Sequence, residues 1–293
     1  SRHLGRHLPG NPSLVVKNMP GAGGMRLANY LYTLARQDGT EIGIVNQGAA
    51  MSQALNEQGV QYDARRLGWI GSTHQTVNVA FSWHMSPVRT IQDVQKQELI
   101  VGTTGAGSAT SFYPELMNQF LGTKFKVIGG YKGNNDMHLA IERGEVNGRG
   151  AYNWANLRDQ TTWVRDKKVH ILVQMGADRA ADLPDVPLLH ELAKDPADRE
   201  VLEFVSLSPA LGRPFVTPPG LPPERLALLR RGFEAMLKDP EFLAEAAGSR
   251  LEIDPIPGEK LAEIVERTLR ASPETVKRAK LAMSRGAEAK KEQ

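Results

Sequence analysis

The sequence predicts an α/β fold in which strands of parallel or mixed sheets are connected by helices. Short apolar runs, typical of buried strands, alternate along the chain with longer segments whose apolar residues recur every three or four positions, as in amphipathic helices. The chain has 293 residues, of which 41% are hydrophobic. This length favours two domains over one, because single cores rarely grow much beyond it.

The elements follow in two series. In the first, a glycine-rich turn at 19–24 and a polar turn at 47–50 follow predicted strands, and Thr90 is a good N-cap for a short helix. The strands expected in this series are 13–18, 42–46, 67–72 and 76–81, and its long helix is 25–36. Leu4 and Leu8, at helical spacing before Pro9, predict the last turns of a helix that begins upstream, so we expect that a preceding segment is missing.

The second series begins with the strand at 99–101 and ends before a proline-rich passage at 213–223, which separates it from the rest of the chain. Its further strands are 125–128 and 169–174, and its helices are 111–121, 134–143 and 186–194. A largely helical end follows, with helices expected at 224–237, 239–247 and 258–270.

Composition excludes several classes of protein. The chain has no cysteine, which rules out disulfides, thiolate metal sites and cysteine nucleophiles. No apolar run approaches the roughly 18–20 residues that span a bilayer. The net charge of +3 is spread along the chain, and its one basic block, at 277–291, is interpreted as a solvated helix and terminus. We therefore expect no nucleic-acid partner.

One motif stands out for binding. Residues 102–108 read G-T-T-G-A-G-S and join a strand to a helix, so backbone N–H groups and hydroxyls converge at the positive end of a helix dipole. Such a turn suits a small anion such as a carboxylate, although a plain connection without ligand remains the alternative. It is not a P-loop, since no Gly-Lys-Ser/Thr follows, and Ala106 and Thr110 replace the glycines of a nucleophile elbow around Ser108.

Two other glycine segments favour binding over catalysis. Residues 20–24 lack the third glycine of a dinucleotide fingerprint, and Asn46 replaces its acidic residue, so we expect a tight turn near a ligand rather than a nicotinamide or flavin site. At 131–136, Asn134 or Asn135 is a candidate N-cap whose helix would offer a second array of donors, and capping alone is the alternative. No nucleophile lies beside a general base, and the histidines show no metal-binding pattern with a carboxylate. The sequence thus predicts a protein that is not an enzyme and has no cofactor or metal.

Taken in order, several segments resemble one family. They are residues 15–24, 102–108, 131–133, 140–146, 181–187, 218–224 and 238–242. With them the chain is similar to the periplasmic solute receptors of tripartite tricarboxylate transporters, the Bug or TctC-like proteins. The resemblance implies a two-domain Venus flytrap fold of the periplasmic-binding-protein type with two interdomain crossovers. Domain one would comprise 1–97 plus 213–293, and domain two 98–212. Small carboxylates would bind in the interdomain cleft, which agrees with ligand binding outside the carboxyl ends of strands in α/β sheets.

Carried onto this chain, the resemblance implies ligand contacts from both domains. They are Gln47, Gly48, Ser72 and Thr73 in domain one, and Thr103, Thr104, Gly107, Ser108, Gly133 and Asn134 in domain two. The chain departs from the family in two respects. The family's first strand and its ligand loop are absent from this sequence. After Val146, Ala151 replaces an aspartate, and Arg149 and Tyr152 stand nearby, so we add these two to the candidate contacts and expect a mono- or dicarboxylate, aromatic ones included.

The function that the resemblance implies is a periplasmic receptor that captures a small organic anion and delivers it to membrane transporter subunits, acting as a monomer. Two alternatives remain. A ligand-sensing receptor of the same two-lobed fold without a transport role, such as the sensing domain of a transcription regulator, would require a helix-turn-helix upstream of Ser1, where the family resemblance implies a signal peptide. An α/β enzyme would require a catalytic pair that the sequence does not display.

Overall fold

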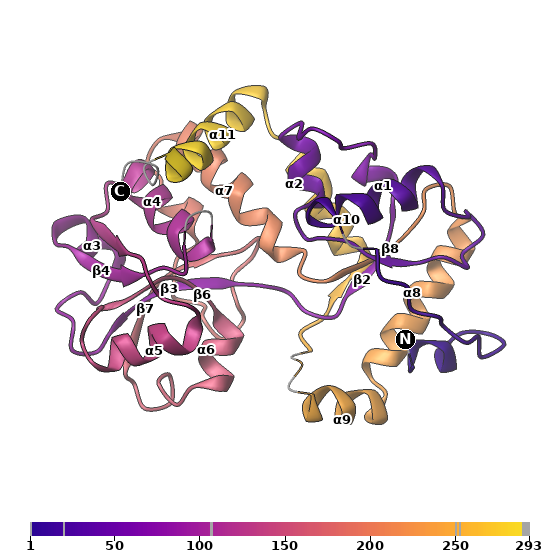
Figure 1. Ribbon diagram of the computed structural model, residues 1–293, viewed down its shortest axis with the longest axis horizontal. Coiled ribbons are helices and arrows are strands. Elements are labelled where there is room, and N and C mark those ends of the chain that lie inside the picture. The colour runs from indigo at the N-terminus through magenta and orange to yellow at the C-terminus, as the bar shows by residue number, and fades with distance from the viewer. Residues whose placement is uncertain (1, 20, 106–107, 250, 252, 289–293) are drawn as a thin grey trace. The chain divides into compact units, whose positions relative to one another are not determined.

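The described residues form two compact units, each built on one β-sheet. The computed structural model describes residues 2–288 apart from 20, 106, 107, 250 and 252 (Figure 1). Unit 1 consists of Ser1–Gln75 and Leu207–Ala271, and unit 2 of Thr76–Ser206 and Ser272–Gln293. The fold is mixed α/β, as the sequence predicts, and each unit is described by itself below.

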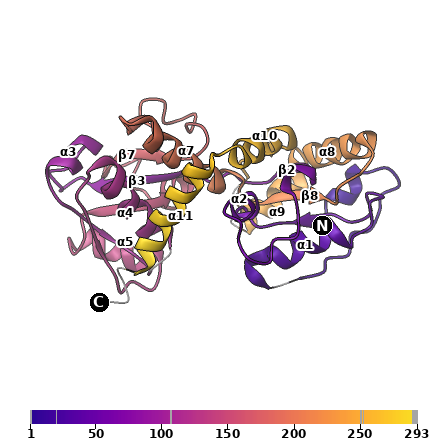
Figure 2. The same ribbon diagram turned by 90° about the horizontal axis from the view of Figure 1, so that it is seen from above.

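The division into units differs from the boundaries expected from the sequence. β3 (Asn78–Trp83), expected in domain one, pairs antiparallel with both β6 (Gly148–Asn153) and β7 (Val169–Met175), so it belongs to unit 2. α11 (Pro273–Glu288), also expected in domain one, packs against α4 (Ala109–Leu121), as Figure 2 shows. The chain therefore passes between the units three times, after residues 75, 206 and 271, and not twice.

The sheet of unit 1 is antiparallel throughout. Its order is β1-β8-β2-β9, and the strands are β1 (Gly43–Ile44), β8 (Pro214–Thr217), β2 (Gly68–Ser72) and β9 (Ile256–Pro257). The expectation of parallel or mixed sheets is wrong here, because β8, for which the sequence predicted no strand, lies between β1 and β2 and is antiparallel to both. Pro214 is the first residue of β8, a position where a strand tolerates the missing N–H.

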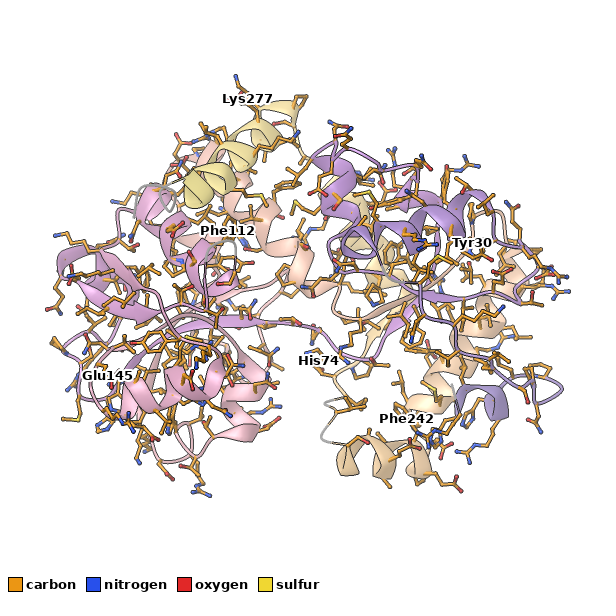
Figure 3. All side chains as sticks on the ribbon, viewed as in Figure 1. Tyr30, His74, Phe112, Glu145, Phe242 and Lys277 are labelled. Atoms are coloured by element: carbon orange, nitrogen blue, oxygen red, sulfur yellow. The ribbon has the colours of Figure 1, made fainter. Side chains whose placement is uncertain are left out.

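Helices pack against this sheet and close the core of unit 1. α8 (Pro223–Leu237) and α10 (Gly258–Leu269) both contact β2, and Phe233 of α8 lies where a side chain at Gly71 would be. Figure 3 labels Phe242, whose ring meets that of His3 edge-on at 5.7 Å between centroids. The remaining elements are η1 (Leu4–His7), η2 (Ala22–Gly24), α1 (Met25–Thr33), α2 (Ala49–Ala54), η3 (Ala64–Arg66) and α9 (Pro240–Gly248).

The strand expected at 13–18 does not form. The segment is irregular, and Val15 and Val16 expose 80% and 68% of their surface. A strand needs a neighbour to satisfy its backbone N–H and C=O groups, and none pairs with this segment in the described part of the chain. The apolar composition of this segment is therefore not sufficient to form a strand without a neighbouring strand to pair with.

The sheet of unit 2 is mixed, with order β5-β4-β6-β3-β7. β4 (Leu99–Gly102) pairs parallel with β5 (Phe125–Ile128) and with β6, whereas β3 is antiparallel to both of its neighbours. α4 packs on one face of β6, where Pro114 fills the space beside Gly150. α5 (Asn134–Glu142) and α6 (Trp154–Gln160) contribute to an apolar cluster with β3 and β6, and they lie on the opposite side of the sheet from α4 in Figure 1.

Two helix predictions in unit 2 have different outcomes. α3 (Ile91–Lys96) begins as expected, with Thr90 and Asp93 forming a reciprocal capping box. The helix expected at 186–194 is wrong, since only the 3-10 turn η4 (Leu189–Leu192) forms there. The long helix follows as α7 (Pro196–Ala210), which begins in unit 2 and ends in unit 1.

Candidate functional site

Three hydroxyl groups meet where β4 ends and α4 begins. Thr103 Oγ1 lies 3.1 Å from Ser108 Oγ and 3.0 Å from Thr110 Oγ1, and the last two oxygens are 2.7 Å apart. Thr103 Oγ1 also accepts the N–H of Gly105 at 3.1 Å, and Ser108 Oγ donates to the Gly105 carbonyl at 2.8 Å. The hydroxyl groups of the predicted motif therefore cluster, and they also hold the turn in shape.

The predicted contact residues of this motif differ in their exposure to solvent. Thr103 is 2% exposed, while the Thr104 side chain is exposed. Gly107 lies outside the described residues. Thr110, which was not selected as a contact, completes the hydroxyl cluster through its bonds to Thr103 and Ser108. Its Oγ1 also accepts the Thr104 N–H at 3.3 Å.

A second loop starts at the same edge of the sheet. Gly102 pairs with Ile128, and the N–H of Thr103 donates to the Ile128 carbonyl at 2.9 Å. The loops that follow β4 and β5 therefore start side by side. The loop after β5 leads to α5, whose N-cap is Gly133. The expectation that Asn134 or Asn135 caps this helix is wrong: Asn134 is its first residue, and the Asp136 carboxylate accepts the Lys132 N–H at 3.1 Å.

A β-bulge places two other candidates on one face of β6. Val79 of β3 pairs with Tyr152, and Phe81 pairs with Arg149, so β6 contains one extra residue between the pairs. Since Val79 and Phe81 are two residues apart, their side chains share a face, and the bulge brings Arg149 and Tyr152 to that face together. In a regular strand, residues three apart would point to opposite faces.

Arg149 is 1% exposed and has few partners. Its Nη2 donates to Asn134 Oδ1 at 2.9 Å, and its guanidinium carbon lies 4.0 Å from the centroid of the Tyr152 ring, within cation–π range. Its Nε and Nη1 are buried without a hydrogen-bond partner among the described residues. Burial lowers the pKa of Arg149 to about 10, so the side chain still carries its charge at neutral pH.

His138 is a neighbour that the sequence did not single out. Its ring contacts Tyr152 at 5.3 Å and Trp163 at 4.7 Å between centroids, and its Nε2 is buried with no hydrogen-bond partner in the part of the chain that the structure describes. Burial, with a smaller effect from the Arg149 charge, lowers the pKa of His138 to about 4, so its ring is neutral at pH 7. The signal was available: His138 lies four residues after Asn134, and residues at that spacing share a helix face.

In unit 1, Gln47 and Gly48 precede α2. Asn46 Oδ1 accepts the Gly48 N–H at 2.7 Å, and the Ser208 hydroxyl donates to the Gln47 carbonyl at 3.4 Å. Gly48 lines a hollow whose empty volume, open solvent at its mouth included, is about 350 Å³. The other residues lining it are Ala22, Gly24, Met25, Ala28, Asn46, Ala49, Ser52, Glu57 and Tyr62. The glycine-rich turn thus borders a hollow.

Ser72 and Thr73 lie at the end of β2. Ser72 is fully buried, and its hydroxyl donates to the His74 carbonyl at 2.8 Å and accepts the Arg213 N–H at 2.9 Å. The Thr73 carbonyl accepts the Asp254 N–H at 3.1 Å. The Ser72 hydroxyl therefore stabilises the junction of β2 and β8, and its role as a ligand contact stays a prediction.

Family membership follows from comparison with known proteins. A family model described as the tripartite tricarboxylate transporter family receptor, TctC, matches residues 6–279. The chain belongs to the TctC family. No curated protein sequence matches it significantly. Solved structures of low sequence identity share its fold.

Three such structures show the likeness. A TctC solute-binding protein from Polaromonas is 16% identical, with a TM-score of 0.69 and coverage of 97% of this chain and 90% of that chain. The periplasmic binding protein BugD is 20% identical, with a TM-score of 0.52 and coverage of 96% and 90%. An R. palustris protein determined with adipate is 20% identical, with a TM-score of 0.51 and coverage of 98% and 90%. This TctC-family chain therefore has a periplasmic-binding-protein fold.

Two properties of the described residues bear on the chemistry of this TctC-family chain. None of its described helices is both long and apolar enough to cross a membrane. No group of three or more His, Asp or Glu side chains in the described part could hold a metal ion. The polar groups gathered at the edge of β4 and β5 are instead hydroxyls, a helix N-terminus and the guanidinium of Arg149.

Proposed function

We propose that this protein is a periplasmic receptor that captures a small organic carboxylate and delivers it to the membrane subunits of a tripartite tricarboxylate-type transporter. Family membership over residues 6–279 carries the proposal. The chemistry of unit 2 supports it, because hydroxyl groups, a helix N-terminus and a cation lie near one edge of a sheet. All three interact favourably with a carboxylate.

The proposed ligand contacts include residues of both units. In unit 2 they are Thr103, Thr104, Gly107, Ser108, Gly133, Asn134, Arg149 and Tyr152, and in unit 1 they are Gln47, Gly48, Ser72 and Thr73. The two loops that follow β4 and β5 start side by side, which supports their acting on one ligand. We propose that the receptor works as a monomer.

The proposed ligand is a mono- or dicarboxylate without an amino group. Ala151 occupies the position where the family resemblance places an aspartate, which removes a partner for a ligand ammonium. The structure of the R. palustris protein with adipate makes that dicarboxylate a suitable first probe.

A thermal-shift panel tests the proposal. The purified chain is heated with succinate, adipate, benzoate or terephthalate, each beside its uncharged amide. A ligand present at 100 times its Kd stabilises the folded state by about 2.7 kcal/mol, which is readily measured as a higher melting temperature. The proposal predicts a shift with at least one acid and a smaller shift with its amide. Equal melting temperatures across a broad carboxylate panel would contradict it.

A further inference from the structure

Arg149 is a buried cation with no counter-ion among the residues that the structure describes. Among the described residues its only hydrogen-bond partner is the neutral Asn134 side chain, and no carboxylate forms an ion pair with it. Placing an ionised side chain in the protein interior is strongly unfavourable even after the protein relaxes. Proteins rarely keep such a group unless a partner charge compensates it.

The groups around Arg149 do not supply that charge. Tyr152 presents its ring to the guanidinium, and burial raises the pKa of its hydroxyl, so it is neutral at pH 7. His138 on α5 is also neutral at pH 7, because burial lowers the pKa of its ring. Glu142 of α5, whose charge acts on His138, accepts a hydrogen bond from the Trp163 indole at 3.1 Å. The guanidinium is therefore arranged among neutral partners.

The hydrogen bond of Arg149 links the buried guanidinium to the solvent-exposed start of a helix. Asn134, which it contacts, is exposed and is the first residue of the nine-residue helix α5. The first backbone N–H groups of a helix have no partner within the helix and carry partial positive charge. In the preceding loop, Gly129, Gly130 and Gly133 have no atom within 4 Å of where a Cβ would stand, so each of these residues borders open space on that side.

We propose that Arg149 recognises the charge of the ligand: a carboxylate binds at the first turn of α5 and replaces Asn134 Oδ1 as the acceptor for the guanidinium. The exposed Asn134 side chain turns aside, and the planar guanidinium, fixed against Tyr152, presents two N–H groups to the two carboxylate oxygens. This inference rests on the proposed function and specifies which residue of unit 2 distinguishes an acid from its neutral analogue.

The test compares Arg149→Met and Arg149→Lys with wild type. Binding of adipate and of adipamide is measured by calorimetry. If another acid of the thermal-shift panel binds wild type more tightly than adipate does, that acid and its amide are used instead. Losing hydrogen bonds to a charged ligand should weaken acid binding by R149M about 10- to 150-fold, with little change for the amide. The melting temperature of unliganded R149M should equal or exceed that of wild type, because an uncompensated buried charge is removed.

Arg165→Met is the matched control, since Arg165 is an exposed arginine of unit 2 paired with its neighbour Asp166, and this variant should bind as wild type does. An R149M protein with wild-type acid affinity overturns the inference. So does one that binds acid and amide with equally reduced affinity, since that result marks a purely structural role. If R149M does not fold, R149K decides: it keeps the charge without the planar fork, and acid affinity within twofold of wild type overturns the inference. Failure of wild type to bind any acid refutes the proposed function instead.

Discussion

Replacing Thr103 by valine tests whether the hydroxyl cluster holds the turn after β4. The substitution keeps the shape of the side chain and removes Oγ1, which bonds Ser108, Thr110 and the backbone of Gly105 at 3.0–3.1 Å. Ser108 and Thr110 retain their mutual bond of 2.7 Å, so the main losses are two or three hydrogen bonds at a residue that is 2% exposed. At about 1 kcal/mol each, the free energy of unfolding should fall by about 2–3 kcal/mol.

Calorimetry or circular dichroism measures this change as a melting temperature, which should fall by about 5–10 °C for a unit of this size. Thr104→Val is the matched control for stability, because the Thr104 side chain is exposed, and its effect should stay within about 0.5 kcal/mol. The same melting temperature for T103V and T104V would show that the cluster does not stabilise the turn. Any loss of carboxylate binding by T103V would then need a direct contact as its explanation.

Two further substitutions probe packing and pH dependence. Gly150→Ala places a Cβ 1.9 Å from Pro114 Cγ, so the free energy of unfolding measured with denaturant should fall by about 1–3 kcal/mol. Gly129→Ala, the control in open space, should leave it nearly unchanged. Equal stabilities of the two variants would refute the tight packing of α4 on β6. A hydrogen bond from His7, with Arg6 adding to it, lowers the pKa of Asp239 to about 2, below its unfolded value near 3.9. Asp239 therefore stabilises the fold above pH 4 and loses this effect as the pH falls toward 2, so Asp239→Asn should flatten the stability profile in that window, and an unchanged acid slope would contradict the assignment.

The sequence predicted those elements whose signals are local. The strand at 125–128 forms as expected, because a short apolar run between polar turns is sufficient to define it. The amphipathic helices at 224–237 and 258–270 agree with α8 and α10 to within one residue at each end. The Thr90 cap is also local, since both partners of its capping box lie within four residues.

Elements that depend on distant partners were missed or misplaced. The run at 13–18 has strand composition but no pairing partner in the described structure. β6, which reads G-R-G-A-Y-N, lacks an apolar alternation and exists because β3 and β4 pair with it. The sequence predicted the boundary between the units after β3, but it lies before β3, because only long-range pairing assigns β3 to unit 2.

The candidate site shows the same division. The hydroxyl turn could be predicted because Thr103, Ser108 and Thr110 are close in sequence. Arg149 was selected from a departure from the family pattern, but its burial and its contact with Asn134 depend on a bulge that no sequence signal announces.

Direct titration tests the central claim, which is that this chain is a carboxylate receptor. Isothermal titration calorimetry with the strongest acid of the panel should give saturable binding with one ligand per chain, and the corresponding amide should bind at least about tenfold more weakly because it lacks the charge. The absence of saturable heat with every acid, together with unchanged melting temperatures, would contradict the account.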